Sequence, residues 1–155
     1  MNWYSRIKGS YDELHGEEQE KKYNIIKPFI LKGKVLDVGC GNGKLLQKIP
    51  DSIGVEPSQD FITPGKIVCG KAEALPFKDK SFDVIISLTA LHHADVKKSM
   101  AELLRVGGKQ WILTILKKSS KFKKWKDAIN SAFKNVQELD ANQDKAFICA
   151  KPRLK

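Results

Sequence analysis

Apolar residues occur along the chain in short runs that alternate with amphipathic stretches. The short runs predict seven β-strands, at 35–38, 53–56, 67–70, 82–88, 110–116, 136–139 and 146–150. Helical spacing between the strands predicts helices at 44–48, 96–105 and 121–133. A leading helix begins near Glu17 and is disturbed at Pro28.

This alternation predicts an α/β fold with a seven-stranded, mostly parallel sheet. Only the turn-like residues 140–144 separate the last two strands, so we expect a C-terminal antiparallel hairpin. The connection PSQDFITPG holds two prolines and has no room for a regular helix, which indicates a pared-down set of helices. With 155 residues we expect one domain, made of an N-terminal segment and leading helix (1–31) and a core (33–155).

The stretch VLDVGCGNGKLLQ, at 35–47, is typical of a strand, a tight turn and a helix. Glycine recurs at every second position of the turn, as Gly39, Gly41 and Gly43. Without a β-carbon the backbone can turn sharply and approach a ligand, with its amide groups free to bind it. A dinucleotide fingerprint would have its third glycine where this chain has Lys44, so NAD is disfavoured.

An acidic residue ends the second predicted strand. Glu56 lies thirteen residues after Gly43, in GVEPS, where a carboxylate can accept both hydroxyls of a ribose. Alone, Glu56 would be read as a surface acid. Together with the glycine turn, it predicts a site for a nucleoside with a free ribose.

Three motifs, VLDVGCGNG, GVEPS and CGKAEALPFKDKSFDVIISLTALHH, resemble those of the class I S-adenosylmethionine (SAM) dependent methyltransferases. The resemblance is to the small type 11 group, which also contains quinone-biosynthesis enzymes. It covers 33–116 by motif and the rest by strand order. It implies a Rossmann-like fold and SAM as cofactor, and we expect the glycine turn to bind both SAM and S-adenosylhomocysteine. We predict no metal site.

The resemblance also implies cofactor contacts. Asp37 and the glycine turn would surround the methionine end of SAM, Glu56 the ribose, and the Ala72 amide the adenine, whereas Lys71 departs from the aspartate common in the family. Another role for Asp37 is to cap the turn, but an acid at an apolar strand end is costly unless paired. The predicted cofactor-binding residues are Asp37, Gly39, Cys40, Gly41, Gly43, Glu56, Pro57, Ala72, Glu73, Ser87 and Leu88.

Two histidines, His92 and His93, follow the fourth predicted strand. In the family that the motifs resemble, a histidine here faces the substrate side of the cofactor. We therefore predict that His93 orients or deprotonates the methyl acceptor, with His92 the less favoured of the pair. The alternative is that both are ordinary surface or hydrogen-bonded residues.

The chain carries 28 Lys and Arg against 18 Asp and Glu, a formal charge of +10, with only three arginines. This surplus fits phosphate backbones and fits solubility equally well. The segment KKSSKFKKWK, at 117–126, combines six lysines with Phe122 and Trp125. These aromatics share helical spacing with Ile129 and Phe133, so we expect a core stripe with the lysines facing solvent.

The sequence contains fewer signals for the methyl acceptor than for the cofactor. The Asn/Asp-Pro-Pro-aromatic motif of exocyclic base-amine methyltransferases is absent, since that position reads SLTALHH. No insertion is large enough for a lid, and an open face favours a large substrate. We predict methylation of a base in ribosomal or transfer RNA, bound through the lysine-rich surface. The alternatives are a small-molecule methyltransferase, for a quinone-like or other metabolite, and a non-catalytic SAM-binding partner subunit.

The three cysteines are odd in number and lie in or beside apolar runs, which favours a reduced, cytoplasmic protein without a zinc site. No apolar run approaches the roughly 18 residues of a membrane span, and the polar start MNWYSRIKGSYDE does not resemble a signal peptide.

Overall fold

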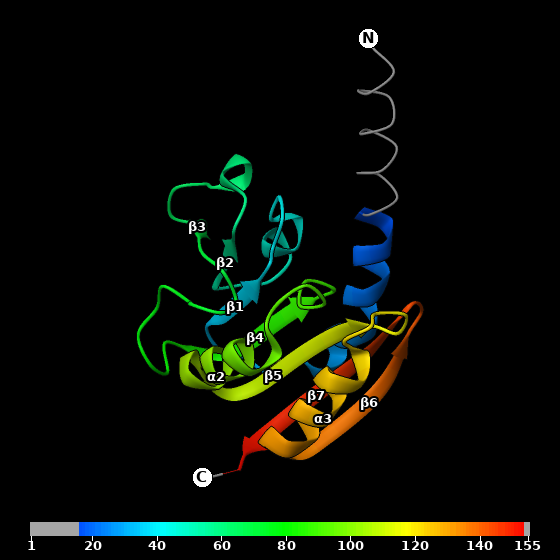
Figure 1. The fold of residues 1–155 in the computed structure, drawn as a ribbon. Coiled ribbons are helices and arrows are strands. Elements are labelled where there is room, and N and C mark those ends of the chain that lie inside the picture. Colours follow the sequence, from blue (N-terminus) through cyan, green and yellow to red (C-terminus); the bar gives the residue numbers. More distant parts are fainter. Residues whose placement is uncertain (1–15, 154–155) are drawn as a thin grey trace.

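The computed structural model describes residues 16–153, in which seven strands form one mixed sheet of order β3-β2-β1-β4-β5-β7-β6 (Figure 1). Strands β1 to β5 run parallel, and β7 pairs antiparallel with both β5 and β6. The predicted fold class is confirmed. The strands are β1 (Val35–Val38), β2 (Ser52–Glu56), β3 (Ile67–Cys69), β4 (Phe82–Leu88), β5 (Gly107–Leu116), β6 (Phe133–Ala141) and β7 (Asp144–Pro152).

The helices are few and short, as predicted. The link between β2 and β3 holds a single 3₁₀ turn, and the turn after β1 leads into another 3₁₀ turn where a helix was expected at 44–48. The helical elements are residues 16–26, η1 (Lys27–Phe29), η2 (Lys44–Gln47), η3 (Gln59–Phe61), α2 (Val96–Val106) and α3 (Phe122–Ala132). Pro28 lies in η1, where the leading helix tightens into 3₁₀ geometry.

Four strands are longer than the apolar pattern indicated, β2 by one residue and β5, β6 and β7 by three or more. The hairpin β6–β7 is paired from Phe133↔Pro152 to Ala141↔Asp144. The hydrogen bonds of a sheet join backbone groups, so the pairing extends beyond the apolar residues into polar ones. Strand β5 begins directly after α2, at Gly107. A β-carbon there would lie 2.7 Å from the Trp111 ring, so only glycine allows helix and strand to join without a loop.

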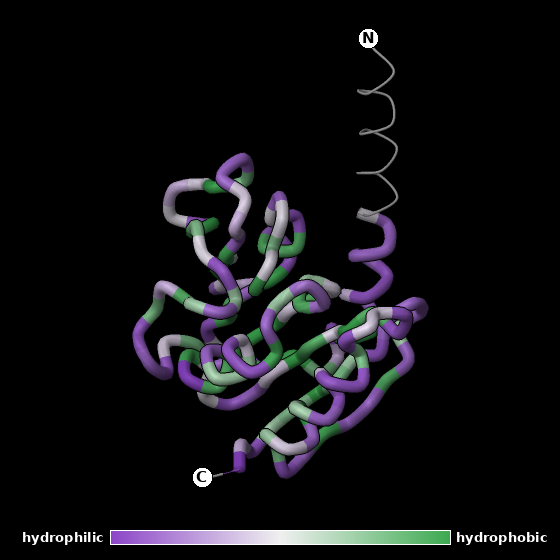
Figure 2. The backbone as a smooth tube through the Cα atoms, in the orientation of Figure 1, coloured by the Kyte–Doolittle hydropathy of each residue, from purple (hydrophilic) through white to green (hydrophobic). Residues whose placement is uncertain are grey.

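Helices cover both faces of the sheet. On one face α2 and α3 enclose the larger core cluster, which includes Trp111, Trp125 and Phe147 (Figure 1). On the other face the helix at 16–26 contributes Tyr23 and Ile26 to a second cluster. Figure 2 shows hydrophobic segments along the central strands β4 and β5.

The predicted core stripe is confirmed, although Phe133 begins β6 and does not end α3. Trp125, Ile129 and Phe133 are fully buried, and Phe122 packs against them partly buried. The Trp125 indole N–H donates to the Leu91 carbonyl, 3.0 Å away, which ties α3 to the turn after β4.

Residues 1–15 of the predicted N-terminal segment lie outside the described residues, and the division of the chain at 31–33 stays a prediction. No helix among the described residues is long and apolar enough to cross a membrane.

Cys40, Cys69 and Cys149 are free thiols, and Cys69 is exposed rather than packed in an apolar run, because β3 is an edge strand. The cytoplasmic location stays a prediction.

Candidate cofactor and acceptor site

The turn after β1 adopts a conformation that glycine favours. Gly39, Gly41 and Gly43 all have φ between +57° and +76°, in the left-handed region. A β-carbon on Gly39 would lie 2.3 Å from the Ala90 Cβ, whereas one on Gly41 would meet no atom within 4 Å. Gly39 therefore allows close packing, and Gly41 leaves open space at the carboxyl end of the sheet, where ligands of this fold class bind.

Glu56, at the end of β2, is hydrogen-bonded to the glycine turn. The Gly41 N–H donates to its Oε2 at 3.0 Å, and the Ser58 N–H donates to its Oε1 at 3.3 Å. Each carboxylate oxygen has two acceptor positions, so both can still accept a ribose hydroxyl. The side chain thus links β2 to the glycine turn and keeps the capacity that the sequence predicted for it.

Asp37 is a buried carboxylate in β1, with 3% of its surface exposed. Burial, and next the negative charge of Glu56, raise the pKa of Asp37 to about 7. We find no hydrogen bond from the turn to its side chain among the described residues, so a capping role is not supported. A buried carboxylate without a partner is costly, and a cation beside it would offset that cost. The ammonium group of SAM fits this position.

A cavity of about 670 Å³ opens between the glycine turn and the helix at 16–26. Its volume suits a ligand the size of a nucleoside derivative. The lining includes five predicted residues, which are Asp37, Gly39, Cys40, Gly41 and Leu88. It also includes residues that the sequence analysis missed: Gly16, Gln19, Glu20, Asn42, Lys44, Leu45, Gln47, Lys48, Asp60 and Phe61.

Gln19 is the missed residue with the clearest contact. Its Nε2 donates to the Leu88 carbonyl at 3.4 Å, which places the leading helix against the end of β4. A single glutamine in a charged helical stretch carries no local signal of such a contact. The pairing of helix and strand end comes from the fold.

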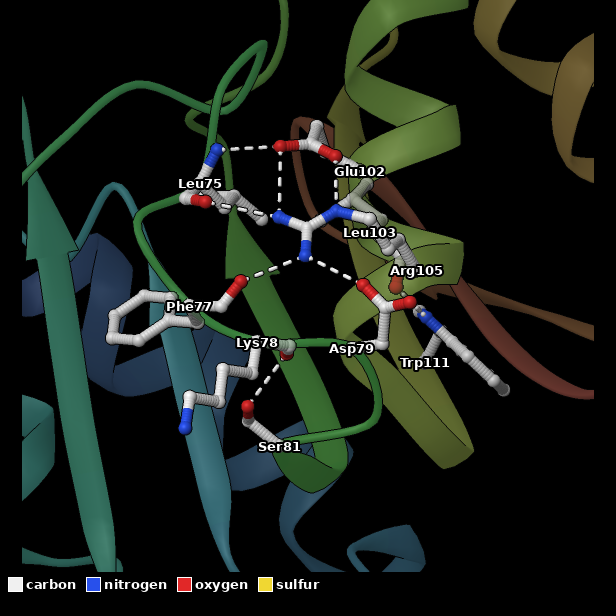
Figure 3. A network of polar contacts seen from close by, with 9 residues as sticks. All are labelled: Leu75, Phe77, Lys78, Asp79, Ser81, Glu102, Leu103, Arg105 and Trp111. Atoms are coloured by element: carbon white, nitrogen blue, oxygen red, sulfur yellow. Dashed lines mark hydrogen bonds and ion pairs between the residues drawn. The ribbon is translucent and has the colours of Figure 1, made fainter.

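The loop between β3 and β4 is held by Arg105 of α2 (Figure 3). The guanidinium donates to the carbonyls of Phe77 at 2.7 Å and Leu75 at 3.0 Å, and to Asp79 at 3.0 Å. Glu102 accepts from Arg105 and from the Leu75 N–H, and the bond from Arg105 lowers the pKa of Glu102. The sequence analysis missed this network, which fixes the loop that carries Ala72 and Glu73.

The predicted adenine-side residues lie next to this network. Ala72 is partly buried against the core, within a turn closed by a bridge between Lys71 and Ala74. Glu73 accepts from the Asp95 N–H at 3.4 Å, so this turn contacts the start of α2. The structure brings the β3 turn to the carboxyl edge of the sheet, beside β2.

The remaining predicted residues have structural contacts as well. The Ser87 hydroxyl donates to the Val38 carbonyl at 2.8 Å and joins β4 to β1, so this side chain is buried in the sheet. Burial, then the charges of Asp37 and Glu56, raise the pKa of the Cys40 thiol to about 12, so Cys40 is a neutral thiol. Pro57 is exposed beyond the end of β2.

The two histidines lie in the turn after β4, with their ring centroids 4.1 Å apart. His93 is exposed, whereas His92 is half-buried and its Nδ1 is buried without a hydrogen-bond partner among the described residues. Burial, and next His93, lower the pKa of His92. The cavity lining reaches Leu88, four residues before His92. The roles of both histidines stay predictions.

Comparisons with known proteins identify a matching family, related sequences and a shared fold. Residues 36–111 match the family described as a methyltransferase domain. The chain is similar to an uncharacterised protein, MJ1252, of Methanocaldococcus jannaschii, with 35% identity over 114 residues that cover 67% of this chain and 45% of that protein. It is also similar to the Xenopus tropicalis tRNA (carboxymethyluridine(34)-5-O)-methyltransferase alkbh8, with 32% identity over 158 residues, 90% of this chain and 25% of that protein. The chain thus spans less than half the length of either relative.

A solved structure of a SAM-dependent methyltransferase from Thermotoga maritima has the same fold. The TM-score is 0.69 at 21% identity, over 96% of this chain and 98% of the other. The fold and the glycine turn define a class I SAM-dependent methyltransferase domain. Residues 36–111 match the methyltransferase domain family, and this match agrees with the fold of the solved structure. The predicted family, enzyme class and cofactor are confirmed.

Proposed function

We propose that this chain transfers the methyl group of SAM to a base in transfer or ribosomal RNA. The observation that carries the proposal is a group of lysines around the acceptor turn, which we call the acceptor-edge lysines. They are Lys97 and Lys98 at the start of α2, and Lys121 and Lys124 at the start of α3. The sheet edge that holds the cofactor residues and the histidines therefore also carries a concentrated positive charge.

Two contacts place these lysines beside the turn. The Lys121 Nζ donates to the Ala94 carbonyl at 2.9 Å, next to His93. Asp95 caps α2 through the Lys98 N–H; this bond, and then the charges of Lys98, Lys124 and Lys121, lower the pKa of Asp95.

The acceptor-edge lysines have no ion-pair partner within residues 16–153, whereas Lys123 and Lys126 of α3 pair with Asp127 and Glu138. Asp95 offsets part of this charge, but the lysines outnumber it and the cluster stays positive. A positive cluster beside a reaction centre attracts a polyanion, and lysine binds phosphate as a point charge. The similarity to a relative named as a tRNA methyltransferase supports the same substrate class.

The residues of the chain would act mainly by alignment. SAM supplies an electrophilic methyl group, and transfer needs the acceptor atom in line with it in a dry site. Asp37 and the glycine turn would hold the methionine end, and Glu56 would hold the ribose. His93 would orient the acceptor or remove its proton.

The test is transfer of labelled methyl groups from SAM to total cellular RNA, protein and lipid extracts, with mass-spectrometric identification of the labelled nucleoside. We expect label in RNA, reduced at least about tenfold in Lys97→Glu/Lys98→Glu through lost phosphate contacts. Lys78→Glu/Lys80→Glu, in the loop at the opposite edge of the sheet, is the matched control. Label confined to a small phenol or lipid would favour the small-molecule alternative. No incorporation would favour a non-catalytic SAM-binding subunit.

A further inference from the structure

A buried charge network lies beneath the acceptor turn. The Lys22 Nζ is 3.5 Å from the Asp144 Oδ1, and the two side chains are 6% and 0% exposed. Thr89 joins them, since its Oγ1 accepts from Lys22 Nζ at 2.5 Å and donates to Asp144 Oδ2 at 2.5 Å. The three residues come from the leading helix, the end of β4 and the start of β7, and none belongs to the predicted site.

Thr89 has an unfavourable backbone conformation. Its φ is +54°, in the left-handed region, where β-branched residues are rare. Its N–H donates to the Thr114 Oγ1 at 2.9 Å, so β5 also holds it in place. Such conformations persist where the surroundings enforce them, and they gather at functional sites.

Stability alone explains this network poorly. Two buried charges lose much hydration, and well-packed apolar residues often stabilise a protein equally well. The network is also incompletely hydrogen-bonded among the described residues, because Asp144 Oδ1 meets Lys22 only as an ion pair at 3.5 Å. The Nδ1 of His92, on which the charges of Asp144 and Lys22 act, has no hydrogen-bond partner among these residues. A cluster that is costly in this way indicates a function other than stability.

The network adjoins the cofactor cavity on two sides. Thr89 directly follows Leu88, which lines the cavity, and precedes His92 by three residues. Lys22 lies one helical turn after Gln19, which also lines the cavity and bonds to the Leu88 carbonyl. Movement of Thr89 would therefore shift both the end of β4 and the histidine turn.

We propose that Lys22, Thr89 and Asp144 form a positioning network that holds Leu88 and the His92–His93 turn in the geometry needed for methyl transfer. The network acts through these residues rather than on the substrate. The turnover measurements that test this network rest on the proposed function, because they need an RNA acceptor. The NMR measurement described below needs no methyl acceptor.

The first test removes one hydroxyl. Thr89→Val keeps the side-chain shape and loses both bonds, whereas Thr89→Ser keeps the hydroxyl. We expect Thr89→Val to lower kcat on unmodified tRNA about 10- to 100-fold with SAM affinity within about threefold, because the loss is in alignment. Thr89→Ser should restore most of the turnover. Equal turnover of Thr89→Val and the parent chain would overturn the proposal.

The second test separates positioning from stability. Lys22→Met leaves a buried charge unpaired and should lower the melting temperature, and Lys22→Met/Asp144→Leu should recover it. Positioning requires that turnover stays low in this double variant. Turnover that recovers together with the melting temperature would show a structural role only. Lys109→Met, which breaks the exposed pair with Asp83 at the opposite edge of the sheet, is the matched control.

The third test follows the imidazole of His92 by NMR as a function of pH. The charged groups that act on His92 are His93, Lys22 and Asp144. Asp144→Asn removes an anion and should lower the titration midpoint of His92, and Lys22→Met removes a cation and should raise it. Thr89→Val should shift the His92 signals, and Thr89→Ser should leave them near the parent values.

Unchanged His92 signals and midpoint in Thr89→Val would overturn the proposal. A parent chain that methylates no RNA but shows these NMR shifts would contradict the proposed function and leave the network's control of the turn supported.

Discussion

The backbone N–H of Gly41 donates to the Glu56 carboxylate, with 3.0 Å between Gly41 N and Glu56 Oε2. The residue expected to bind the ribose therefore also sets the position of the glycine turn. Loss of this side chain removes direct contacts to the nucleoside and loosens the loop at the same time.

We expect Glu56→Ala to weaken SAM binding by about 2–4 kcal/mol, roughly 30- to 1000-fold in Kd, because hydrogen bonds to a charged acceptor are lost. Calorimetric titration with SAM measures it, with Glu138→Ala as an exposed-acid control. NAD should bind far more weakly than SAM. Unchanged SAM affinity in Glu56→Ala would remove the ribose assignment.

Asp37 makes the stability of the ligand-free protein depend on pH. Its pKa rises from 3.8 to about 7 on folding, so the folded state binds the extra proton. The associated stability is fully present below about pH 4 and is lost as the pH rises through about 7. Asp37→Asn should therefore be more stable than the parent at pH 8, by an amount on the order of 2–4 kcal/mol, and similar at low pH.

The same substitution should weaken SAM binding, because a cationic ligand loses its buried carboxylate partner. Urea unfolding at about pH 4 and about pH 8 and SAM calorimetry measure the two effects, with Asp127→Asn as the exposed control. Binding of SAM near pH 7 should also release a proton from the parent chain. Equal stability of variant and parent at pH 8 would contradict this account of Asp37.

Arg105 should affect cofactor binding through the loop that it holds. Arg105→Lys keeps the charge but cannot reach both carbonyls and both acids, so we expect a loss of about 1–3 kcal/mol in unfolding free energy. SAM affinity should fall several-fold because the Ala72 turn becomes mobile. Denaturant unfolding and calorimetry test this, against Lys78→Ala in the same loop. A destabilised variant with unchanged SAM affinity would limit Arg105 to a structural role.

RNA affinity should fall steeply with salt if lysines provide most of the binding. Each neutralised phosphate contributes a slope of about −0.7 to −0.9, so four or five contacts predict about −3 to −4 in log K against log salt. Lys121→Ala/Lys124→Ala should reduce the magnitude of the slope by the contribution of about two phosphate contacts. Lys78→Ala/Lys80→Ala should leave the slope unchanged. A flat titration between about 50 and 200 mM salt would contradict lysine-mediated RNA binding.

His93→Ala should lower turnover about 10²- to 10⁴-fold with nearly unchanged SAM affinity if His93 takes a proton from the acceptor. His93→Gln, which keeps a hydrogen-bonding side chain but cannot take up the proton, should then lose as much turnover as His93→Ala. If His93 only orients the acceptor, the loss is smaller and His93→Gln should recover part of it. Full activity of His93→Ala would leave alignment as the only catalytic device.

The strand periodicity, the glycine turn and the acid at the end of β2 could all be read from the sequence. Each depends on residues that are neighbours in the chain: Gly39, Gly41 and Gly43 occupy one turn, and their conformation follows from local sterics. The alternation of strands with helical segments then restricts the topology to a few arrangements. For these reasons the fold class and the family could be predicted.

The charged residues packed around the site could not be predicted from the sequence in this way. Lys22 belongs to a charged stretch that looks solvated, and Asp144 to a turn-like stretch, yet both are buried. Arg105 likewise holds a loop about thirty residues before it in the chain, as in its bond to the Leu75 carbonyl. A buried charge is stable only beside its partner, and the partner is supplied by a different element. Sequence alone determined the cofactor turn and the sheet, and tertiary packing decided which charges lie beneath the acceptor turn.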